Sequence, residues 1–389
     1  MYFVGIDISK YKHDCFIVTD SGEIIANSFS FNNDRDGFNH LLTVLNTLIP
    51  KGDIRIGFEA TGHYAFNLKL FLEEAHYSFM EFNPVLLTKF IKSQSLRRTK
   101  TDAIDAMSIA RWLMTVEYKP YPIGFYHTYA LKSLTRLRDT LIKQRSFYIV
   151  KLTNILDHTF PEFKPFFSNR FSKTALYLLE NYVTAERMAH MNSASYEHLR
   201  KISRGKFSMQ KFFKLKELAK NTVGEDHELF TSQLSSLLSL YKLAAQEVAS
   251  LEAQIESLIN DLKPRALSIP GIGPQSAAII YAEYGDLSKF QSPAQMLSFA
   301  GLEPGYYQSG ISEHGGHMVK RGSSHLRYTL MNLCIPLIQY NMVFAEYYQK
   351  KRHEGKTHRV ACSHLVKKLI RVIYTLEKNN IDFDSSKLR

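Results

Sequence analysis

Three strand-like segments follow one another at the start of the chain, and this run limits the fold more than any other feature of the sequence. The segments are YFVGIDI at 2–8, DCFIVTD at 14–20 and EIIANSFSF at 23–31. The turn residues Asp20, Ser21 and Gly22 lie between the last two. Because strands joined by short turns pair antiparallel, the run predicts a meander.

Helical and strand-like segments alternate after this meander. In chain order they are a helix at 34–48, a strand at 54–60, a helix at 67–75 and a strand at 77–83. Strands that are first antiparallel and then alternate with helices predict a mixed sheet flanked by helices. The first part of the chain is therefore expected to be an α/β domain.

Four acidic residues fall where these elements begin or end. Asp7 lies on the first strand and Glu59 ends the fourth, while Asp102 and Asp105 share one face of the helix expected in RTKTDAIDAMSIARWLM. Carboxylates gathered from distant segments repel one another unless a divalent cation holds them. The ordered set therefore predicts a site for one or two Mg²⁺ ions and metal-assisted phosphoryl transfer on nucleic acid. Each acid alone has a simpler explanation, as a turn, a cap or a favourable charge near a helix start.

The overall charge agrees with a polyanionic partner. The 389 residues include 49 Lys and Arg against 37 Asp and Glu, which gives a net charge of +12 and a pI near 9.3. A chain of this length predicts two or three domains.

Cysteine usage and hydropathy indicate the compartment. Cys15, Cys334 and Cys362 are scattered and form no CxxC pair, so neither a disulfide framework nor a zinc site is indicated. The sequence shows no cleavable signal and no apolar run of membrane length. We therefore expect a cytoplasmic protein without a membrane partner.

Two basic segments are candidate contacts for nucleic acid. The stretch KFIKSQSLRRTKTD leads directly into the acid pair, and its candidate phosphate ligands are Arg97, Arg98 and Lys100. The segment 130–156 is expected to form a long amphipathic helix, whose basic face includes Arg136, Arg138 and Arg145. A solvated loop is the alternative for the first segment, and the second segment suits either DNA or RNA.

An apolar stripe in the middle of the chain predicts a coiled coil. Its residues are spaced three and four apart over four heptads: Leu234, Leu237, Tyr241, Ala244, Val248, Leu251, Ile255, Leu258 and Leu262. Such a stripe is expected to join protomers into a homo-oligomer, a dimer or a tetramer. A helical hairpin within one chain is the alternative, because an antiparallel partner helix needs the same stripe.

The last part of the chain opens on a glycine turn. In LSIPGIGPQSAAIIYAEYGD, Gly271 and Gly273 precede a helical run, which resembles a helix-hairpin-helix unit whose free backbone N–H groups suit a DNA phosphate. The following glycine-rich stretch lacks helical periodicity until Ser323. A loop of that length inside a domain is usually functional or disordered. Apart from it, the last part is expected to be mostly α-helical.

Several stretches together resemble the insertion-sequence one-ten family of transposases, which includes the Piv-type DNA invertases. They are GIDISK with Asp7, FEATG with Glu59, KTDAIDA with Asp102 and Asp105, IPGIGP, and GLEPGYYQSG followed by GGHMVKRGSSHLR. The resemblance implies three domains. These are a RuvC-like DEDD catalytic domain of the RNase H fold at 1–125, a helical and coiled-coil linker at 126–265, and a transposase domain with a nucleophilic serine at 266–389.

The resemblance also implies a mechanism and an RNA partner. Family members are recombinases in which a C-terminal serine becomes covalently joined to DNA, and Ser309 matches that serine here. Lys320, Arg321 and Arg327 would then clamp phosphate groups near it. Its rivals as the nucleophile are Ser312, Ser323 and Ser324. A bridge RNA that pairs with target and donor DNA is implied in the same way, whereas residues 160–225 match no motif.

Two other classes of function remain open. A metal-dependent nuclease similar to a Holliday-junction resolvase would use the four acids with water and leave the C-terminal serine without a role. A noncatalytic scaffold would need only the basic faces, the glycine hairpin and the coiled coil.

Overall fold

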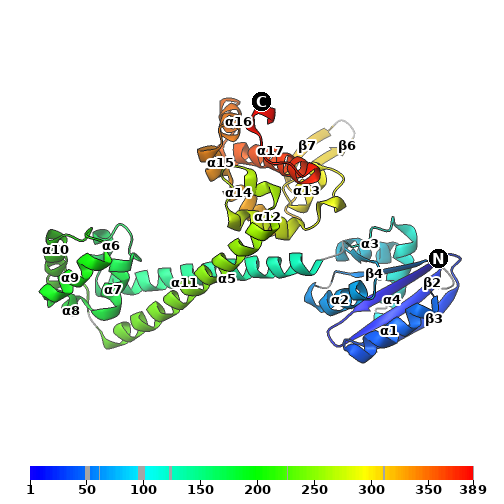
Figure 1. Ribbon diagram of the computed structural model, residues 1–389, viewed down its shortest axis with the longest axis horizontal. Helices are drawn as coiled ribbons and strands as arrows, with labels where there is room; N and C mark the ends of the chain where they lie inside the picture. The colour runs from blue at the N-terminus through cyan, green and yellow to red at the C-terminus, as the bar shows by residue number, and fades with distance from the viewer. Residues whose placement is uncertain are drawn as a thin grey trace. The chain divides into compact units, whose positions relative to one another are not determined.

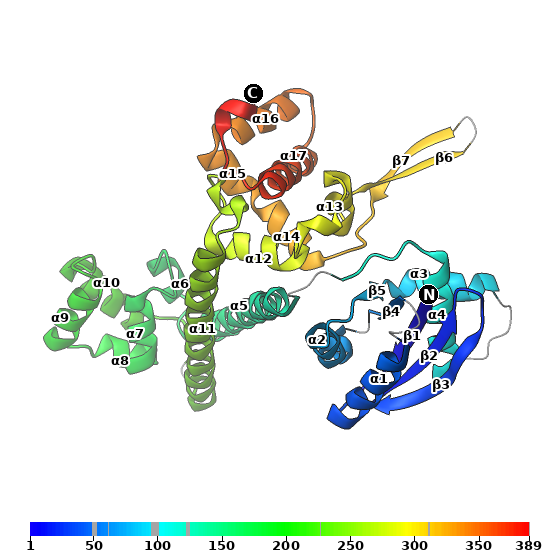
Figure 2. The same ribbon diagram turned by 45° about the vertical axis from the view of Figure 1, so that its right-hand side comes forward.

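The computed structural model describes residues 1–48, 53–60, 62–94, 101–121, 125–225, 227–309 and 312–388. The chain divides into two compact units, Met1–Tyr126 and His127–Arg389, which Figures 1 and 2 show from two sides. The finer division into three domains stays a prediction. Within the described residues, no helix combines the length and the apolar character that a membrane span requires.

The N-terminal unit contains a mixed five-stranded sheet of order β3-β2-β1-β4-β5. Its strands are β1 (Tyr2–Ile8), β2 (Lys12–Thr19), β3 (Ile24–Asn32), β4 (Ile54–Glu59) and β5 (Phe79–Phe82). The first three strands pair antiparallel, while β4 runs parallel to both β1 and β5. The predicted α/β class and the mixed sheet are therefore confirmed.

Helices cover both faces of this sheet. They are α1 (Arg35–Leu48), α2 (Phe66–Glu74), α3 (Pro84–Gln94) and α4 (Asp102–Thr115), with a short 3-10 turn, η2, at Gly62–Ala65. Buried side chains of α1 and α2, such as Leu41 and Leu68, pack with the even-numbered residues of β1. Buried side chains of α3 and α4, such as Leu87 and Ile109, form a second core with Phe3. Sequence periodicity did not predict α3, because its residues were assigned to the basic loop before α4.

Two paired glycines let α4 lie directly on the sheet. Gly5 of β1 and Gly57 of β4 are partners in the parallel register. A Cβ on Gly5 would lie 2.3 Å from the carbonyl oxygen of Ala106 and 2.4 Å from the backbone nitrogen of Ala110. A Cβ on Gly57 would lie 2.8 Å from the ring of Phe82. The backbone of α4 therefore packs on the backbone of β1 with no side chain between them.

The C-terminal unit begins with two long helices and a small helical lobe. The long helices are α5 (Phe125–Thr159) and α11 (Glu228–Leu262). Between them in sequence lie α6 (Phe163–Phe166), α7 (Lys173–Asn181), α8 (Ala185–Ala189), α9 (Ser193–Ile202) and α10 (Met209–Lys220). Their side chains share one hydrophobic core with the ends of α5 and α11, which includes Leu152, Leu178, Phe212 and Leu234.

The rest of this unit is a helical domain around α17 (His358–Asn379). Its other helices are α12 (Pro274–Tyr284), α13 (Pro293–Phe299), α14 (Ser324–Asn332), α15 (Cys334–Tyr340) and α16 (Met342–His353), with short 3-10 turns η3 (Arg265–Ser268), η4 (Leu287–Lys289) and η5 (Ser385–Leu388). Buried residues of α17, including Leu365, Leu369 and Ile373, lie in a core that also takes side chains from α12, α14 and α15.

The glycine-rich stretch is not the irregular loop that its sequence indicates. It forms an antiparallel hairpin of β6 (Pro304–Ser309) and β7 (Ser312–Met318). Its strands contain Gly305, Gly315 and Gly316, and glycine has low β-propensity, which hides the strands from a pattern search. This region of the mostly α-helical domain is therefore β-structured.

Much of the apolar stripe of α11 is buried inside the single chain. Leu234, Tyr241, Ala244, Val248 and Ile255 are all buried. The two last positions are open, since Leu258 is 40% and Leu262 is 42% exposed. Burial within one chain agrees with the intramolecular alternative for most of the stripe.

We predict that Gly5→Ala destabilises the N-terminal unit because the new methyl group meets backbone atoms of α4 that have no room to move. The free energy of unfolding should fall by roughly 3 kcal/mol, the upper part of the range for overpacking. Urea unfolding followed by the fluorescence of Trp112, the single tryptophan of the chain and a residue of α4, measures this change directly.

Gly57→Ala is the matched control for this prediction. Its Cβ would meet the ends of two side chains, the Phe82 ring and Leu113 Cδ1, which can shift, so a loss of only roughly 1 kcal/mol is expected. Equal unfolding free energies for the two variants would show that α4 does not pack on the β1 backbone as described.

Candidate functional site

Backbone pairing brings three of the predicted acids toward one end of β1. Gly5 pairs with Gly57 and Ile6 with Phe58, so the next residues, Asp7 and Glu59, are level on neighbouring strands. The contact of Gly5 with Ala106 and Ala110 lays α4 against β1, and the charges of Asp102 and Asp105 act on Asp7. Asp105 belongs to the first turn of α4.

The first turn of α4 is well defined. Thr101 caps the helix, and its hydroxyl oxygen accepts a hydrogen bond of 3.3 Å from the Ile104 N–H. Asp102 is exposed and Asp105 is half-buried. Negative charge is favourable at a helix N-terminus, which offsets part of the repulsion between these two acids.

The electrostatics of Asp7 show that the other three predicted acids act on it. Burial, followed in order by the negative charges of Asp105, Asp102, Glu59 and Asp14, raises the pKa of Asp7 to about 6. Repulsion from Glu59 and from both α4 acids means that β1, β4 and α4 contribute to one electronegative site. The structure thus brings the four predicted acids into electrostatic contact.

A fifth acid, Asp14, lies beside this site and was missed in the sequence. It is the antiparallel partner of Asp7 in the β1–β2 pair and is only 6% exposed. Ser30 Oγ donates a hydrogen bond of 2.6 Å to Asp14 Oδ1, and Lys12 Nζ lies 3.5 Å from Oδ2. The signal that identifies Asp14 is the hairpin register, because a tight turn centred between 10 and 11 places residue 7 opposite residue 14.

The donor set of the site fits a hard divalent cation. Asp7, Glu59, Asp102 and Asp105 offer only carboxylate oxygens, which are the ligands that Mg²⁺ prefers. Among the described residues, no group of three or more His, Cys, Asp or Glu is already gathered closely enough to hold an ion. The side chains would therefore have to draw together around a cation. The binding of a cation would be favoured because it relieves the repulsion at Asp7.

The candidate nucleophile Ser309 ends β6, where its backbone is the register partner of Ser312. The side chains of 306–309 and 312–317 lie outside the described part of the structure. Its other rivals lie at the start of α14. Ser323 caps that helix by accepting a 3.1 Å hydrogen bond from the Leu326 N–H, and Ser324 is exposed.

Several predicted nucleic-acid contacts are engaged within the protein. Arg136 donates two hydrogen bonds, of 2.8 and 3.1 Å, to the carboxylate of Glu283, and Arg138 forms an ion pair with Glu252. Arg145 is half-buried on α5. Arg97, Arg98 and Lys100 lie outside the described residues. The role of all six in binding nucleic acid stays a prediction.

The side chain of Glu283 is fully buried. Burial alone would raise its pKa, but the hydrogen bonds from Arg136 and the charges of Lys132 and Arg136 outweigh that effect and lower the pKa. Lys132 Nζ lies 3.5 Å from Glu283 Oε2. This ion-pair network joins α5 to α12, and sequence analysis missed it because Arg136 and Glu283 are far apart in the chain.

The glycine turn and the basic residues after β7 have mixed surroundings. Gly271 packs inside the protein, since a Cβ there would lie 2.9 Å from the Pro336 carbonyl oxygen, whereas a Cβ on Gly273 would meet no atom within 4 Å. Arg327 Nη1 donates to the carbonyl oxygens of Ala300 and Lys320, at 3.3 and 3.4 Å. Lys320 and Arg321 are exposed. Binding of nucleic acid by these five residues also stays a prediction.

We predict that Asp7→Asn stabilises the chain near neutral pH when divalent ions are absent. The pKa of Asp7 is about 6 in the folded chain against 3.8 for a free side chain, so its unfavourable contribution develops as the pH rises from about 4 to 6 and is complete above that range. Removing the charge should raise the free energy of unfolding at pH 8 by roughly 1–2 kcal/mol, since partial exposure screens the repulsion. The gain should vanish below about pH 4.

Urea unfolding in EDTA across this pH range measures the effect. Asp53→Asn removes an exposed carboxyl group just before β4 and should give no comparable gain. A gain for Asp7→Asn that is equal at pH 4 and pH 8 would contradict the electrostatic explanation.

Comparison with protein families identifies both ends of the chain. The family model of DEDD transposases of the IS110 type, described as a transposase, matches residues 4–161. A second, described as "Transposase IS116/IS110/IS902 family", matches residues 264–349. The first match contains all four predicted acids, and the second contains the β6–β7 hairpin.

Curated relatives agree with these matches. The chain is 24% identical to the "Pilin gene-inverting protein" of Moraxella bovis over 98% of this chain and 97% of that protein. It is 24% identical to the "Insertion element IS116 uncharacterized 44.8 kDa protein" of Streptomyces clavuligerus over 96% of this chain and 94% of that one.

A third relative matches over a shorter region. The "Insertion element IS110 uncharacterized 43.6 kDa protein" of Streptomyces coelicolor is 30% identical over 39% of this chain and 38% of its own length. The two family models occur here in one chain, and the inverting protein of Moraxella bovis aligns with nearly all of it. The chain belongs to the IS110 family of transposases.

Proposed function

We propose that this protein is a DNA recombinase of an insertion sequence that cuts DNA strands and joins them to new partners. The observation that carries the proposal is the environment of Asp7 on β1, whose pKa is raised first by burial and then by the negative charges of Asp105 and Asp102 on α4 and Glu59 on β4. A titratable group with a perturbed pKa beside other acids is typical of a functional site. The sheet, with helices on both faces and acids at strand ends, also supports the RuvC-like DEDD assignment of residues 1–125.

The four acids would hold one or two Mg²⁺ ions. When bound, Mg²⁺ supplies positive charge that polarises a phosphodiester and favours a deprotonated attacking oxygen. Asp7 must lose its own proton before it can act as a ligand, so its carboxyl group should be ionised above about pH 6. The close packing of α4 at Gly5 fixes the distance between the strand acids and the helix acids.

Ser309 is the proposed nucleophile. Its Oγ would form a bond to phosphorus while the bond from phosphorus to one deoxyribose oxygen breaks. The serine proton would leave to a base, and the departing oxygen would take up a proton. A hydroxyl group of a new strand would reverse these steps, so the energy of the first bond is kept in the phosphoserine ester and no external energy source is needed.

The acids and the serine belong to different units of the chain, so the reaction requires both units to meet on the same DNA. We propose that target and donor DNA, a bridge RNA and further copies of this chain in a dimer or tetramer are the partners, in the cytoplasm. The open C-terminal end of the α11 stripe, at Leu258 and Leu262, supports a coiled-coil contact between copies.

Asp105→Asn should abolish strand cleavage while leaving folding and DNA binding largely intact. The amide keeps the shape of the side chain but removes one negative ligand. Cleavage of a labelled donor DNA in Mg²⁺, together with the affinity for that DNA in EDTA, measures the two effects separately. Wild-type turnover by the variant would exclude the metal site, and activity of the wild type in EDTA would do the same.

Ser309→Ala should abolish both recombination and the covalent protein–DNA adduct, because no other group in the proposal forms the ester. Denaturing gel electrophoresis with end-labelled DNA detects the adduct. Ser312→Ala is the matched control from the facing strand and should keep measurable activity.

The result also separates the remaining candidates. If the Ser309→Ala variant still formed an adduct, another serine would be the nucleophile. Cleavage by the wild type without any adduct would instead favour the resolvase-like nuclease that uses water. Binding without any cleavage in Mg²⁺ would favour the noncatalytic scaffold.

A further inference from the structure

The helical lobe of α6 to α10 has no role in the function proposed above. The two family models cover residues 4–161 and 264–349, so neither reaches it. Buried residues such as Phe163, Leu178, Leu199 and Phe212 give it a continuous hydrophobic core. It is therefore a compact, separately built part of the C-terminal unit.

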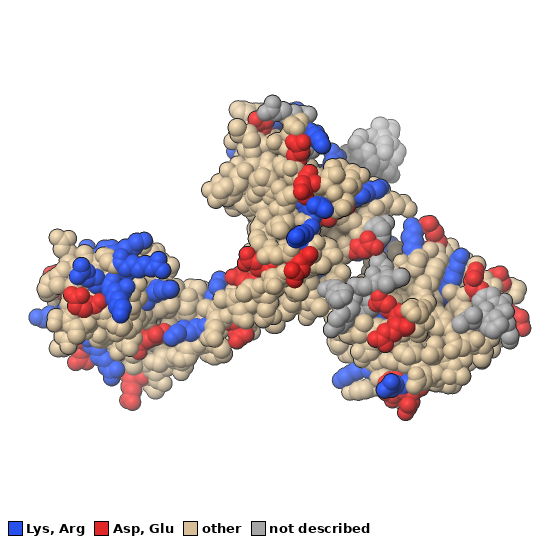
Figure 3. All heavy atoms as spheres, in the orientation of Figure 1, with Lys and Arg blue, Asp and Glu red and all other residues tan. Residues whose placement is uncertain are grey.

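The end of α9, the turn after it and α10 carry a strongly basic surface, which we call the α9–α10 surface. Residues 198–220 contain eight Lys or Arg and one Glu, a net charge of +7 against +12 for the whole chain. Its exposed cations include Lys201, Arg204, Lys206, Lys211, Lys214 and Lys220. Figure 3 shows Lys and Arg gathered on this lobe.

These six cations have no acidic partner within the described residues. The nearby ion pairs involve other groups: Arg200 lies 3.9 Å from Glu197, and Lys242 lies 2.7 Å from Glu180. The half-buried Lys216 donates to the Met191 carbonyl oxygen. Concentrated positive charge that the protein does not neutralise attracts a polyanion.

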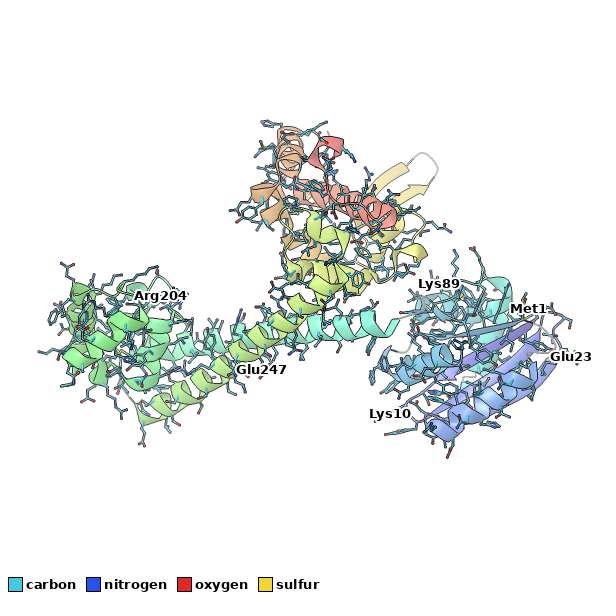
Figure 4. All side chains as sticks on the ribbon, in the orientation of Figure 1. Met1, Lys10, Glu23, Lys89, Arg204 and Glu247 are labelled. Carbon is cyan, nitrogen blue, oxygen red and sulfur yellow. The ribbon has the colours of Figure 1, made fainter. Side chains whose placement is uncertain are left out.

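The turn that carries Arg204 is rigid. Arg204 has a φ of 52° and Gly205 a φ of 80°, and the Gly205 N–H donates a 2.9 Å hydrogen bond to the Arg200 carbonyl oxygen. The Phe207 N–H also donates to Ser203 Oγ at 3.0 Å. A left-handed backbone at a non-glycine residue costs about 1–2 kcal/mol, which these hydrogen bonds offset. Arg204 is thus held at a fixed place on the lobe, marked in Figure 4.

The shape of α10 favours duplex DNA over other polyanions. Phe212, Leu215 and Ala219 face the core, which leaves the opposite side of α10 open. Lys214 lies on that side, and Lys211 and Lys220 lie on its two flanks. The major groove of B-form DNA admits an α-helix, whereas the deep, narrow major groove of A-form RNA does not.

The scarcity of exposed aromatic rings disfavours single strands. Surfaces that bind single strands stack several bases on aromatic side chains. Within residues 198–220, Phe213, which is 62% exposed, is the one exposed Phe, Tyr or Trp. Contacts of this surface are therefore dominated by charge.

We propose that the α9–α10 surface binds the phosphate backbone of B-form duplex DNA, with α10 directed toward the major groove. The choice of DNA rests on the proposed function, but the binding itself requires no cleavage. The surface would hold DNA that flanks the reacting phosphodiester, independently of its sequence.

The test compares two four-residue variants of the full chain. The first is K201A/R204A/K211A/K214A. The control, K119A/K164A/K242A/K351A, loses the same charge from lysines that already lie within 4.0 Å of an acid. Anisotropy of a fluorescein-labelled DNA duplex of arbitrary sequence gives Kd as a function of salt, in EDTA so that no strand is cut.

The first variant should bind the duplex on the order of ten-fold or more weakly at physiological salt, and the slope of log K against log salt should fall by roughly 3 to 4. The control should change the slope by less than one. Circular dichroism should show both variants folded, since all the replaced side chains lie outside the hydrophobic cores. If the first variant is unfolded, K211Q/K214Q takes its place, with a slope change of roughly 2 expected.

Four results would overturn the proposal. They are wild-type affinity of the first variant, an equal loss in the control, tighter binding of an RNA duplex of the same sequence, and a loss from Phe213→Ala as large as that of the first variant. Asp105→Asn should bind the duplex with wild-type affinity while failing to cleave. A failure of the catalytic proposal is thereby distinguishable from a failure of this one.

Discussion

The backbone of α4 lies against the backbone of β1, and the proposed chemistry of the N-terminal unit depends on this contact. Gly5 leaves no side chain between β1 and α4, and its partner Gly57 on β4 makes room for the Phe82 ring and the Leu113 side chain. Because α4 begins with two acids and β1 ends next to a third, the same contact forces like charges together. The favourable packing of Ile109, Leu113 and their neighbours must offset that repulsion.

Two buried acids in this chain illustrate opposite solutions to the same problem. Glu283 is fully buried, but Arg136 and Lys132 neutralise it, and its pKa falls. Asp7 is partly buried among other carboxylates, and its pKa rises to about 6. The first arrangement stabilises the junction of α5 and α12. The second destabilises the folded chain when Asp7 is ionised, and a divalent cation would remove that unfavourable contribution. This contrast distinguishes a structural ion pair from a candidate catalytic site.

Local pattern predicted the α/β sheet and the long helix α5, since each depends on residues close in sequence, and it placed each of the four acids on its own strand or helix. Asp14 required the register of a hairpin, and the partner of Arg136 required the packing of α5 on α12. The β6–β7 hairpin was missed because its glycines give no strand signal. The apolar stripe of α11 was visible in the sequence, but the segment that covers it was not. An apolar stripe indicates that a helix face is buried and does not identify the segment that buries it.

The most direct test of the central claim is a calorimetric titration of the protein with Mg²⁺ in the absence of DNA. If Asp7, Glu59, Asp102 and Asp105 form one site, the wild type should bind Mg²⁺ saturably at pH 8, and binding should weaken as the pH falls through about 6, where Asp7 takes up its proton. Replacing any one of the four acids by its amide should weaken binding in a similar way. Mg²⁺ affinity that is independent of pH between 5 and 8, or unchanged in the Asp7→Asn variant, would contradict the account.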